Sequence, residues 1–134
     1  MTNARTNDRT FSASIIEASR ELTPVETVKM KDTKDAQRLD AATADGPITF
    51  CPVMYAILAI HNEKSDDKDY EQYLIVDNEG NKYVTGSQSF WNAFMDIWTD
   101  LQELTEAGET WAIKVYQIPS KNYQGRNFLS CSLA

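Results

Sequence analysis

The chain has 134 residues, the length of one domain, and its 42% of apolar residues is enough to form a core. Twenty acidic residues outnumber thirteen basic ones and give a net charge of −7, which disfavours nucleic acid as the default partner. No apolar run reaches the ~20 residues of a membrane span, and the first residues lack the apolar region of a secretory signal. We therefore expect a cytoplasmic protein that has no contact with a membrane.

The first part of the chain is mostly polar. Residues 1–24 are rich in Thr, Ser, Asn and Arg, so we expect a flexible tail there and a single domain over residues 25–134. Alternation over residues 25–31 predicts a short edge strand. A short helix is predicted over residues 33–43, because Thr33 can cap its N-terminus and apolar residues follow at spacings of three.

Three strands are predicted in the middle of the chain. Residues 48–60 are the most apolar run; a helix would fit their hydrophobicity, but β-branched and aromatic residues and Pro52 favour a long, bent strand. The next two strands are residues 70–76 and 81–85. The sequence Asp77-Asn-Glu-Gly80 between them is typical of a tight hairpin turn.

The clearest helix is predicted over residues 87–106. Ser87 or Ser89 can cap its N-terminus, and Gly108 ends it. Its apolar residues recur at spacings of three and four, which places them on one stripe of the helix that faces the core: Phe90, Phe94, Ile97, Trp98 and Leu101.

The C-terminal part predicts two strands, residues 111–118 and 126–133, joined by a run of turn residues. Alternate side chains of a strand point to opposite faces. One face of this hairpin is therefore apolar and belongs to the core: Trp111, Ile113, Val115, Leu129, Cys131 and Leu133. The other face pairs a cation with an aromatic ring on each strand: Lys114 with Tyr116, and Arg126 with Phe128.

Charge is unevenly distributed along the chain. Residues 61–109 carry twelve acids and three lysines, a net charge of −9. After Glu109 there are no acidic side chains, and the three cations are Lys114, Lys121 and Arg126. Cations that neutralise phosphates and aromatic rings that stack on bases are what sequence-tolerant binding of single strands requires. The other interpretation is an ordinary pair of strands whose outer face is solvated.

The order of the predicted elements is β-β-β-α-β-β. This is the order of an OB fold, a five-stranded Greek-key barrel with one helix, whose strand face and loops bind oligonucleotides. The alternative is an open antiparallel sheet with a helix on one face. In both cases the class is mainly β with one helix (α+β), preceded here by the short strand, the short helix and the polar tail.

We find no catalytic constellation. His61 is the only histidine and lies in a charged turn, so neither a histidine-based metal set nor a catalytic triad is available. Asp66, Asp67 and Asp69 lack the pattern of a calcium loop. Cys51 and Cys131 lie in apolar strand patterns and are interpreted as small core residues. We expect no enzymatic activity, no cofactor and no bound metal.

Five segments carry the pattern of a known family. They are Lys82-Tyr-Val-Thr-Gly-Ser-Gln-Ser-Phe-Trp-Asn-Ala-Phe-Met-Asp-Ile97, Thr33-Lys-Asp-Ala-Gln-Arg-Leu39, Lys114-Val-Tyr116, Pro119-Ser-Lys-Asn122 and Gly125-Arg-Asn-Phe-Leu-Ser-Cys131. In this pattern the chain resembles, over residues 29–133, the single-stranded DNA-binding proteins of phages and mobile elements of Gram-positive bacteria. The resemblance implies an OB-type barrel that coats single strands in replication or recombination. By position, the terminal basic hairpin of that family corresponds here to Lys114, Tyr116, Lys121, Tyr123, Arg126 and Phe128.

Taken together, these patterns favour a sequence-tolerant single-stranded DNA-binding protein, located in the host cytoplasm if a phage encodes it. A homodimer, and contacts with replication or recombination proteins, are compatible partner predictions. The alternative from a different class is an acidic inhibitor or DNA mimic, in which residues 61–109 present carboxylates to a basic nucleic-acid enzyme.

Overall fold

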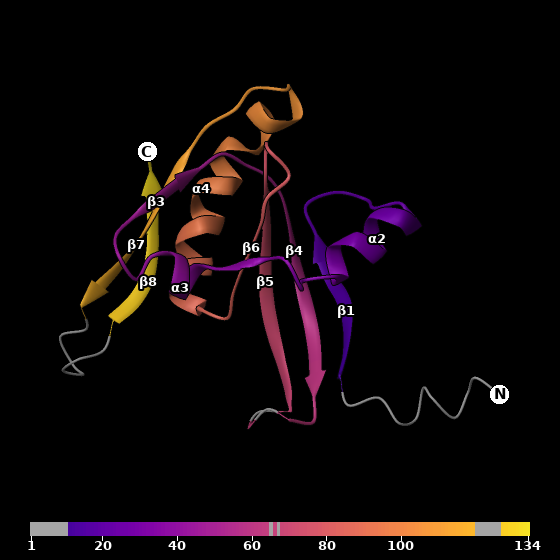
Figure 1. Ribbon diagram of the computed structural model, residues 1–134. Helices are drawn as coiled ribbons and strands as arrows, with labels where there is room; N and C mark the ends of the chain where they lie inside the picture. Colours follow the sequence, from indigo (N-terminus) through magenta and orange to yellow (C-terminus); the bar gives the residue numbers. More distant parts are fainter. Residues whose placement is uncertain (1–10, 65, 67, 120–126) are drawn as a thin grey trace.

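The computed structural model describes residues 11–64, 66, 68–119 and 127–134 (Figure 1). This part of the chain is mainly β and forms two sheets. The larger sheet, which we call sheet A, has five strands in the order β1-β4-β5-β6-β2, and the smaller, sheet B, has three in the order β3-β7-β8. The predicted α+β class is confirmed. Among the described residues the two sheets do not join into a closed barrel, because β6 and β8 do not pair.

The centre of sheet A is the meander of β4 (Pro52–Asn62), β5 (Asp69–Asp77) and β6 (Lys82–Thr85). Neighbouring strands are antiparallel, as predicted for residues 48–60, 70–76 and 81–85. The predicted turn between the last two is also confirmed. Gly80 has a φ of 85°, in the left-handed region that glycine adopts without a steric penalty.

The apolar run 48–60 passes from one sheet to the other. Its first part is β3 (Ile48–Phe50), which pairs with β7 in sheet B. Only Cys51 separates β3 from β4, which pairs with β5 in sheet A. Pro52 donates no backbone hydrogen bond, and the register shifts between Pro52 and Met54, so the bend falls where the ladder is interrupted. The predicted long, bent strand is therefore present as two segments.

The long helix α4 (Gln88–Glu106) provides the centre of the main core. Ser87 caps it, since its hydroxyl accepts a 3.2 Å hydrogen bond from the Phe90 amide, and Gly108 follows with a φ of 83°. The ribbon of α4 lies between strands of sheet A and sheet B in the view of Figure 1. The aromatic stripe of α4 packs in one core with residues of both sheets. Sheet A contributes Tyr55, Tyr73, Ile75 and Tyr83 to this core, and sheet B contributes Phe50, Ile113, Val115, Leu129 and Cys131.

The N-terminal region differs from the prediction of a flexible tail over residues 1–24. Residues 1–10 lie outside the described part, but Phe11–Ala18 form β1, which pairs antiparallel with β4. Backbone pairing to an available strand does not depend on apolar side chains, so composition alone missed this strand. Ala13 and Ile15 pack against a second core on the other face of sheet A, formed around Leu58, Leu74 and Val84.

The predicted edge strand over residues 25–31 is wrong, because Pro24–Lys31 form the helix α2. A capping box begins this helix. The Thr23 hydroxyl accepts a 3.2 Å hydrogen bond from the Glu26 amide, and the Glu26 carboxylate accepts a 2.9 Å bond from the Thr23 amide. Proline at the first helical position adds to the effect. This local chemistry outweighs the weak alternation, and Met30 joins the second core.

The predicted helix over residues 33–43 is only partly present. Leu39–Ala42 form the short helix α3, whereas Gln37–Arg38 form β2, a short strand parallel to β6. In this arrangement the backbone of β2 pairs with an edge of β6 that a longer helix would leave without partners. Leu39 is fully buried in the main core. In the described part of the chain no helix has the length and apolar character of a membrane span.

Candidate nucleic-acid interface

The C-terminal hairpin consists of β7 (Ile113–Pro119) and β8 (Asn127–Leu133). Its inner face matches the predicted register. Val115 is fully buried opposite Cys131, and Leu129 is 4% exposed. Leu133, which we placed on the same core face, is 56% exposed, because it lies at the last position of the strand. Cys131 is a buried thiol whose pKa burial raises to about 12, so it is not a nucleophile at neutral pH.

The outer face of the hairpin carries three of the six predicted site residues. Lys114 is exposed, and its Nζ lies 5.8 Å from the centroid of the Tyr116 ring. The Tyr116 ring is half-buried, and its hydroxyl lies 2.6 Å from Oγ of Ser132 on the neighbouring strand. Phe128 is 42% exposed and pairs with Ile118. An exposed ring, a half-buried ring and an ammonium group thus share one face.

The other three predicted site residues, Lys121, Tyr123 and Arg126, lie outside the described residues. Lys114 is the only charged residue on the three strands of sheet B, β3, β7 and β8, within the ranges given for them. Their other ionisable residues, Tyr116 and Cys131, are neutral at pH 7. Thr49 of β3 pairs with Lys114 and is exposed beside it. The phosphate backbone of a single-stranded DNA would therefore meet no carboxylate on β3, β7 or β8.

The sequence did not reveal a groove of about 680 Å³ that adjoins the outer face. It runs between β8, the β2–α3 segment and the N-terminus of α4, and its lining includes Arg38, Asp40, Ser87, Asn127 and Phe128. The sequence pattern predicts a helix at Arg38 and does not indicate it as a site residue. The one signal in the sequence is Gln117, a polar residue at a position of β7 that alternation places on the core face.

Gln117 joins the two walls of this groove. Its Nε2 donates 2.9 Å hydrogen bonds to the carbonyl of Asp40 and to Oγ1 of Thr43, both of the α3 region. Its Oε1 accepts a 3.0 Å hydrogen bond from Nδ2 of Asn127 on β8. On the other side, Oγ of Ser89 donates a 2.9 Å hydrogen bond to the Leu129 carbonyl. Hydrogen bonds therefore connect β7 to the α3 region on one side of the groove, and α4 to β8 on the other.

Acidic and titratable clusters lie elsewhere in the molecule. The solvent-exposed face of α4 carries four acidic residues: Asp96, Asp100, Glu103 and Glu106. His61 lies near the far end of the β4–β5 hairpin, where hydrogen bonds from its ring to the carboxylates of Asp69 and then Glu63 raise its pKa above the usual value. No group of three or more His, Cys, Asp or Glu residues in the described ranges has the arrangement of a metal site.

No family model, no curated protein and no solved structure matches this chain.

Proposed function

We propose that this protein binds single-stranded DNA, without sequence preference, through the outer face of the β7–β8 hairpin. The observation that carries the proposal is the placement of Lys114, Tyr116 and Phe128 on one accessible face whose described strands bear no carboxylate. Aromatic rings stack on any base, and the cation neutralises phosphate. No catalytic role is included in the proposal.

An OB-like barrel is part of this proposal. Four features support it. The first three are the meander of three strands, the helix between the meander and the final hairpin, and the antiparallel pairing of β3 with β7. The strand that bends from sheet B into sheet A is a fourth. In the described part of the chain, the structure differs from a closed barrel in one respect: β6 and β8 do not pair, and the edge of β6 pairs with β2 instead. A role in phage or mobile-element replication or recombination follows from the sequence resemblance and stays a prediction.

The test is binding of a fluorescent oligo-dT, followed by anisotropy as salt is raised. With about three to five phosphates contacted, the slope of log K against log[salt] should be roughly −2 to −4, from about −0.7 per phosphate on single strands. Binding that is absent at low salt, or that does not change with salt, would contradict the proposal. A duplex of the same length should bind more weakly, because its bases are not available for stacking.

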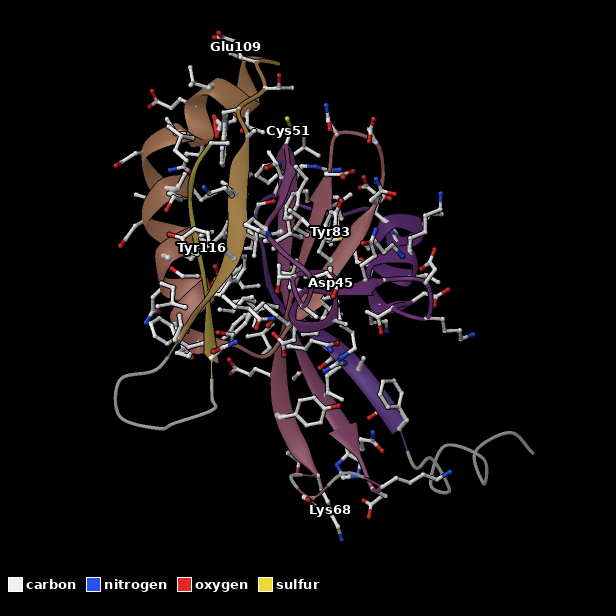
Figure 2. All side chains as sticks on the ribbon, turned by 60° about the vertical axis from the view of Figure 1, so that its left-hand side comes forward. Asp45, Cys51, Lys68, Tyr83, Glu109 and Tyr116 are labelled. Carbon is white, nitrogen blue, oxygen red and sulfur yellow. The ribbon has the colours of Figure 1, made fainter. Side chains whose placement is uncertain are left out.

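A matched pair of variants locates the site. Lys114→Gln should weaken binding and reduce the magnitude of the salt slope by about 0.7. Lys68→Gln makes the same change in net charge at an exposed lysine whose side chain is 60% accessible. Figure 2 shows Lys68 at the tip of the β4–β5 hairpin, well away from Tyr116 on β7. Equal effects of the two substitutions would assign the binding to overall charge rather than to the hairpin.

The acidic inhibitor or DNA mimic remains the second candidate, and the exposed carboxylates of α4 are what favours it. A mimic presents negative charge to a basic enzyme and does not itself bind nucleic acid. The same oligo-dT titration separates the two functions, since a mimic gives no change in anisotropy. If the protein does bind oligo-dT, substitution of Asp96 and Asp100 by Asn should leave this binding unchanged or strengthen it slightly, because both carboxylates are exposed on α4 and not on the hairpin.

A further inference from the structure

We infer that the bound single strand leaves the outer face of the hairpin at Phe128 and enters the groove beside β8, where Arg38 contacts a phosphate. This inference rests on the proposed function and names a further part of its site. Phe128 belongs to both surfaces: it shares the outer face with its partner Ile118, and it lines the groove. The two surfaces therefore meet at this residue.

The chemistry of the groove suits a nucleotide. Its lining includes Phe128, an exposed aromatic residue that can stack on a base, Asn127, an exposed amide that can form hydrogen bonds, and Arg38, an exposed cation that can bind a phosphate. Arg38 is exposed and makes no salt bridge with any described residue. A guanidinium can donate two parallel hydrogen bonds to phosphate oxygens, which an ammonium cannot do. The volume of about 680 Å³ is in the range of small-ligand sites.

The groove is also held in place before any ligand arrives. Backbone pairing of β2 with β6 sets Arg38 opposite Val84, and Gln117 fixes the α3 region to β7. The bond from Ser89 to the Leu129 carbonyl holds the opposite wall. A site whose walls are already ordered loses less conformational entropy on binding.

One group in the groove opposes phosphate. Asp40 is exposed, lines the same groove and is two residues from Arg38. Its structural contribution here is its backbone carbonyl, which accepts from Gln117, so its carboxylate can be neutralised without removing that hydrogen bond. The groove therefore allows a test in two directions, because removing the cation should weaken binding and removing the anion should strengthen it.

The experiment measures oligo-dT affinity and its salt dependence for two pairs of variants. Arg38→Gln should weaken binding about two- to five-fold, the range for one exposed charge contact, and reduce the salt slope by about 0.7. Asp40→Asn should strengthen binding by a similar factor. The matched controls are Lys34→Gln and Asp35→Asn, which make the same charge changes at exposed residues that do not line this groove. Each control should stay within about 1.5-fold of the wild type.

The outcomes separate this inference from the proposed function. If Lys114→Gln weakens binding but Arg38→Gln behaves like Lys34→Gln, the hairpin binds DNA and the groove does not, so this inference is wrong. If the wild type does not bind oligo-dT, both are wrong. Arg38→Lys, which keeps the charge, should retain the full salt slope. A loss of the slope in that variant, with the melting temperature unchanged, would also overturn the phosphate contact.

Discussion

The hydroxyl of Tyr83 donates a 2.8 Å hydrogen bond to Oδ2 of Asp77 from the strand that follows the turn. The other carboxylate oxygen accepts from the amides of Glu79, at 2.9 Å, and Asn81, at 2.8 Å. Asp77 is 4% exposed. Burial acts to raise its pKa, but the hydrogen bonds from Tyr83 and Asn81 outweigh this and hold the pKa below its usual value. One carboxylate thus fixes the β5–β6 turn.

The first prediction concerns Asp77→Asn. At pH 7 the variant should be about 1–3 kcal/mol less stable, because the turn amides and the Tyr83 hydroxyl lose a charged acceptor. Since the folded pKa is lowered, the ionised group stabilises the protein above its unfolded pKa, about 3.9. This contribution is lost as the pH falls through the lower folded pKa. Urea unfolding at several pH values between 7 and 3 should therefore show the difference shrink on acidification.

Glu79→Gln is the control for that measurement. Glu79 lies in the same turn and is exposed, so its substitution should change the free energy of unfolding by no more than about 0.5 kcal/mol. A destabilisation by Asp77→Asn that stays constant from pH 7 to pH 3 would show that the carboxylate charge has no part in holding the turn.

The second prediction concerns base stacking. Phe128→Ala should weaken binding to oligo-dT by about 1–3 kcal/mol, the usual cost of removing one stacking ring. The melting temperature should change little, since the ring is 42% exposed. Leu133→Ala is a matched control, because it removes another exposed apolar side chain from the same strand, on the opposite face. Equal losses of affinity in both variants would assign the effect to the strand rather than to the ring.

The third prediction separates the two aromatic residues of the outer face. Tyr116→Ala should weaken oligo-dT binding by about 1–3 kcal/mol and also lower stability, because the ring is half-buried. Tyr116→Phe keeps the ring and removes the hydrogen bond to Ser132, so it should cost about 0.5–1.5 kcal/mol of stability and leave the affinity unchanged. Loss of affinity in Tyr116→Phe would mean that the hydroxyl, and not the ring, contacts DNA.

The sequence allowed accurate prediction in the middle of the hairpin and along α4, where the environment of a residue follows from the local period. Val115 and Leu129 are buried, and Lys114 is exposed, as alternation indicated, because only one face of this hairpin meets the core. The stripe of α4 followed from its spacing in the same way. In α2 the local signals conflict: the alternation over residues 25–31 predicts a strand, whereas the capping box of Thr23 and Glu26 favours the helix that forms.

Long-range contacts were beyond such reasoning. β1 is ordered by pairing with β4, more than thirty residues further along the chain, as in the pair of Ala18 with Ala56. The groove depends on the bond from Gln117 to Asp40, which are 77 residues apart. A polar residue on a core face indicated that some partner exists, but no spacing rule identifies that partner. Arg38 could be recognised as a candidate site residue only once β2 was placed beside β6.

The fourth prediction tests the register of the hairpin. Val115→Ala should cost about 1–3 kcal/mol of stability, since it opens a cavity at a position that is 0% exposed. Lys114→Ala, one residue away, should change stability by no more than about 0.5 kcal/mol. Affinity for oligo-dT should show the reverse pattern, and comparison of urea unfolding with anisotropy measures both. If the two residues exchanged their effects, the faces would be assigned wrongly, because a one-residue slip reverses every side chain.

The last prediction concerns His61, the only histidine of the sequence, so no other imidazole signal overlaps with its own in an NMR titration. Its Nδ1 lies 2.7 Å from Oδ1 of Asp69, and its Nε2 contacts the Glu63 carboxylate. These hydrogen bonds favour the imidazolium, so the pKa measured by NMR should lie above 6.5. Asp69→Asn should lower it, because it removes the larger of the two contributions.

The sign of the stability effect follows from that shift. Because the folded pKa of His61 is raised, the pair with Asp69 stabilises the protein below the unfolded pKa, and this stabilisation is lost as the pH rises through the folded value. The melting temperature of the wild type should therefore fall slightly more than that of Asp69→Asn between pH 6 and 8 or so. Affinity for oligo-dT should be the same in both proteins at each pH, since His61 is not part of the proposed site. A pH-dependent difference in affinity would place the tip of the β4–β5 hairpin in contact with DNA.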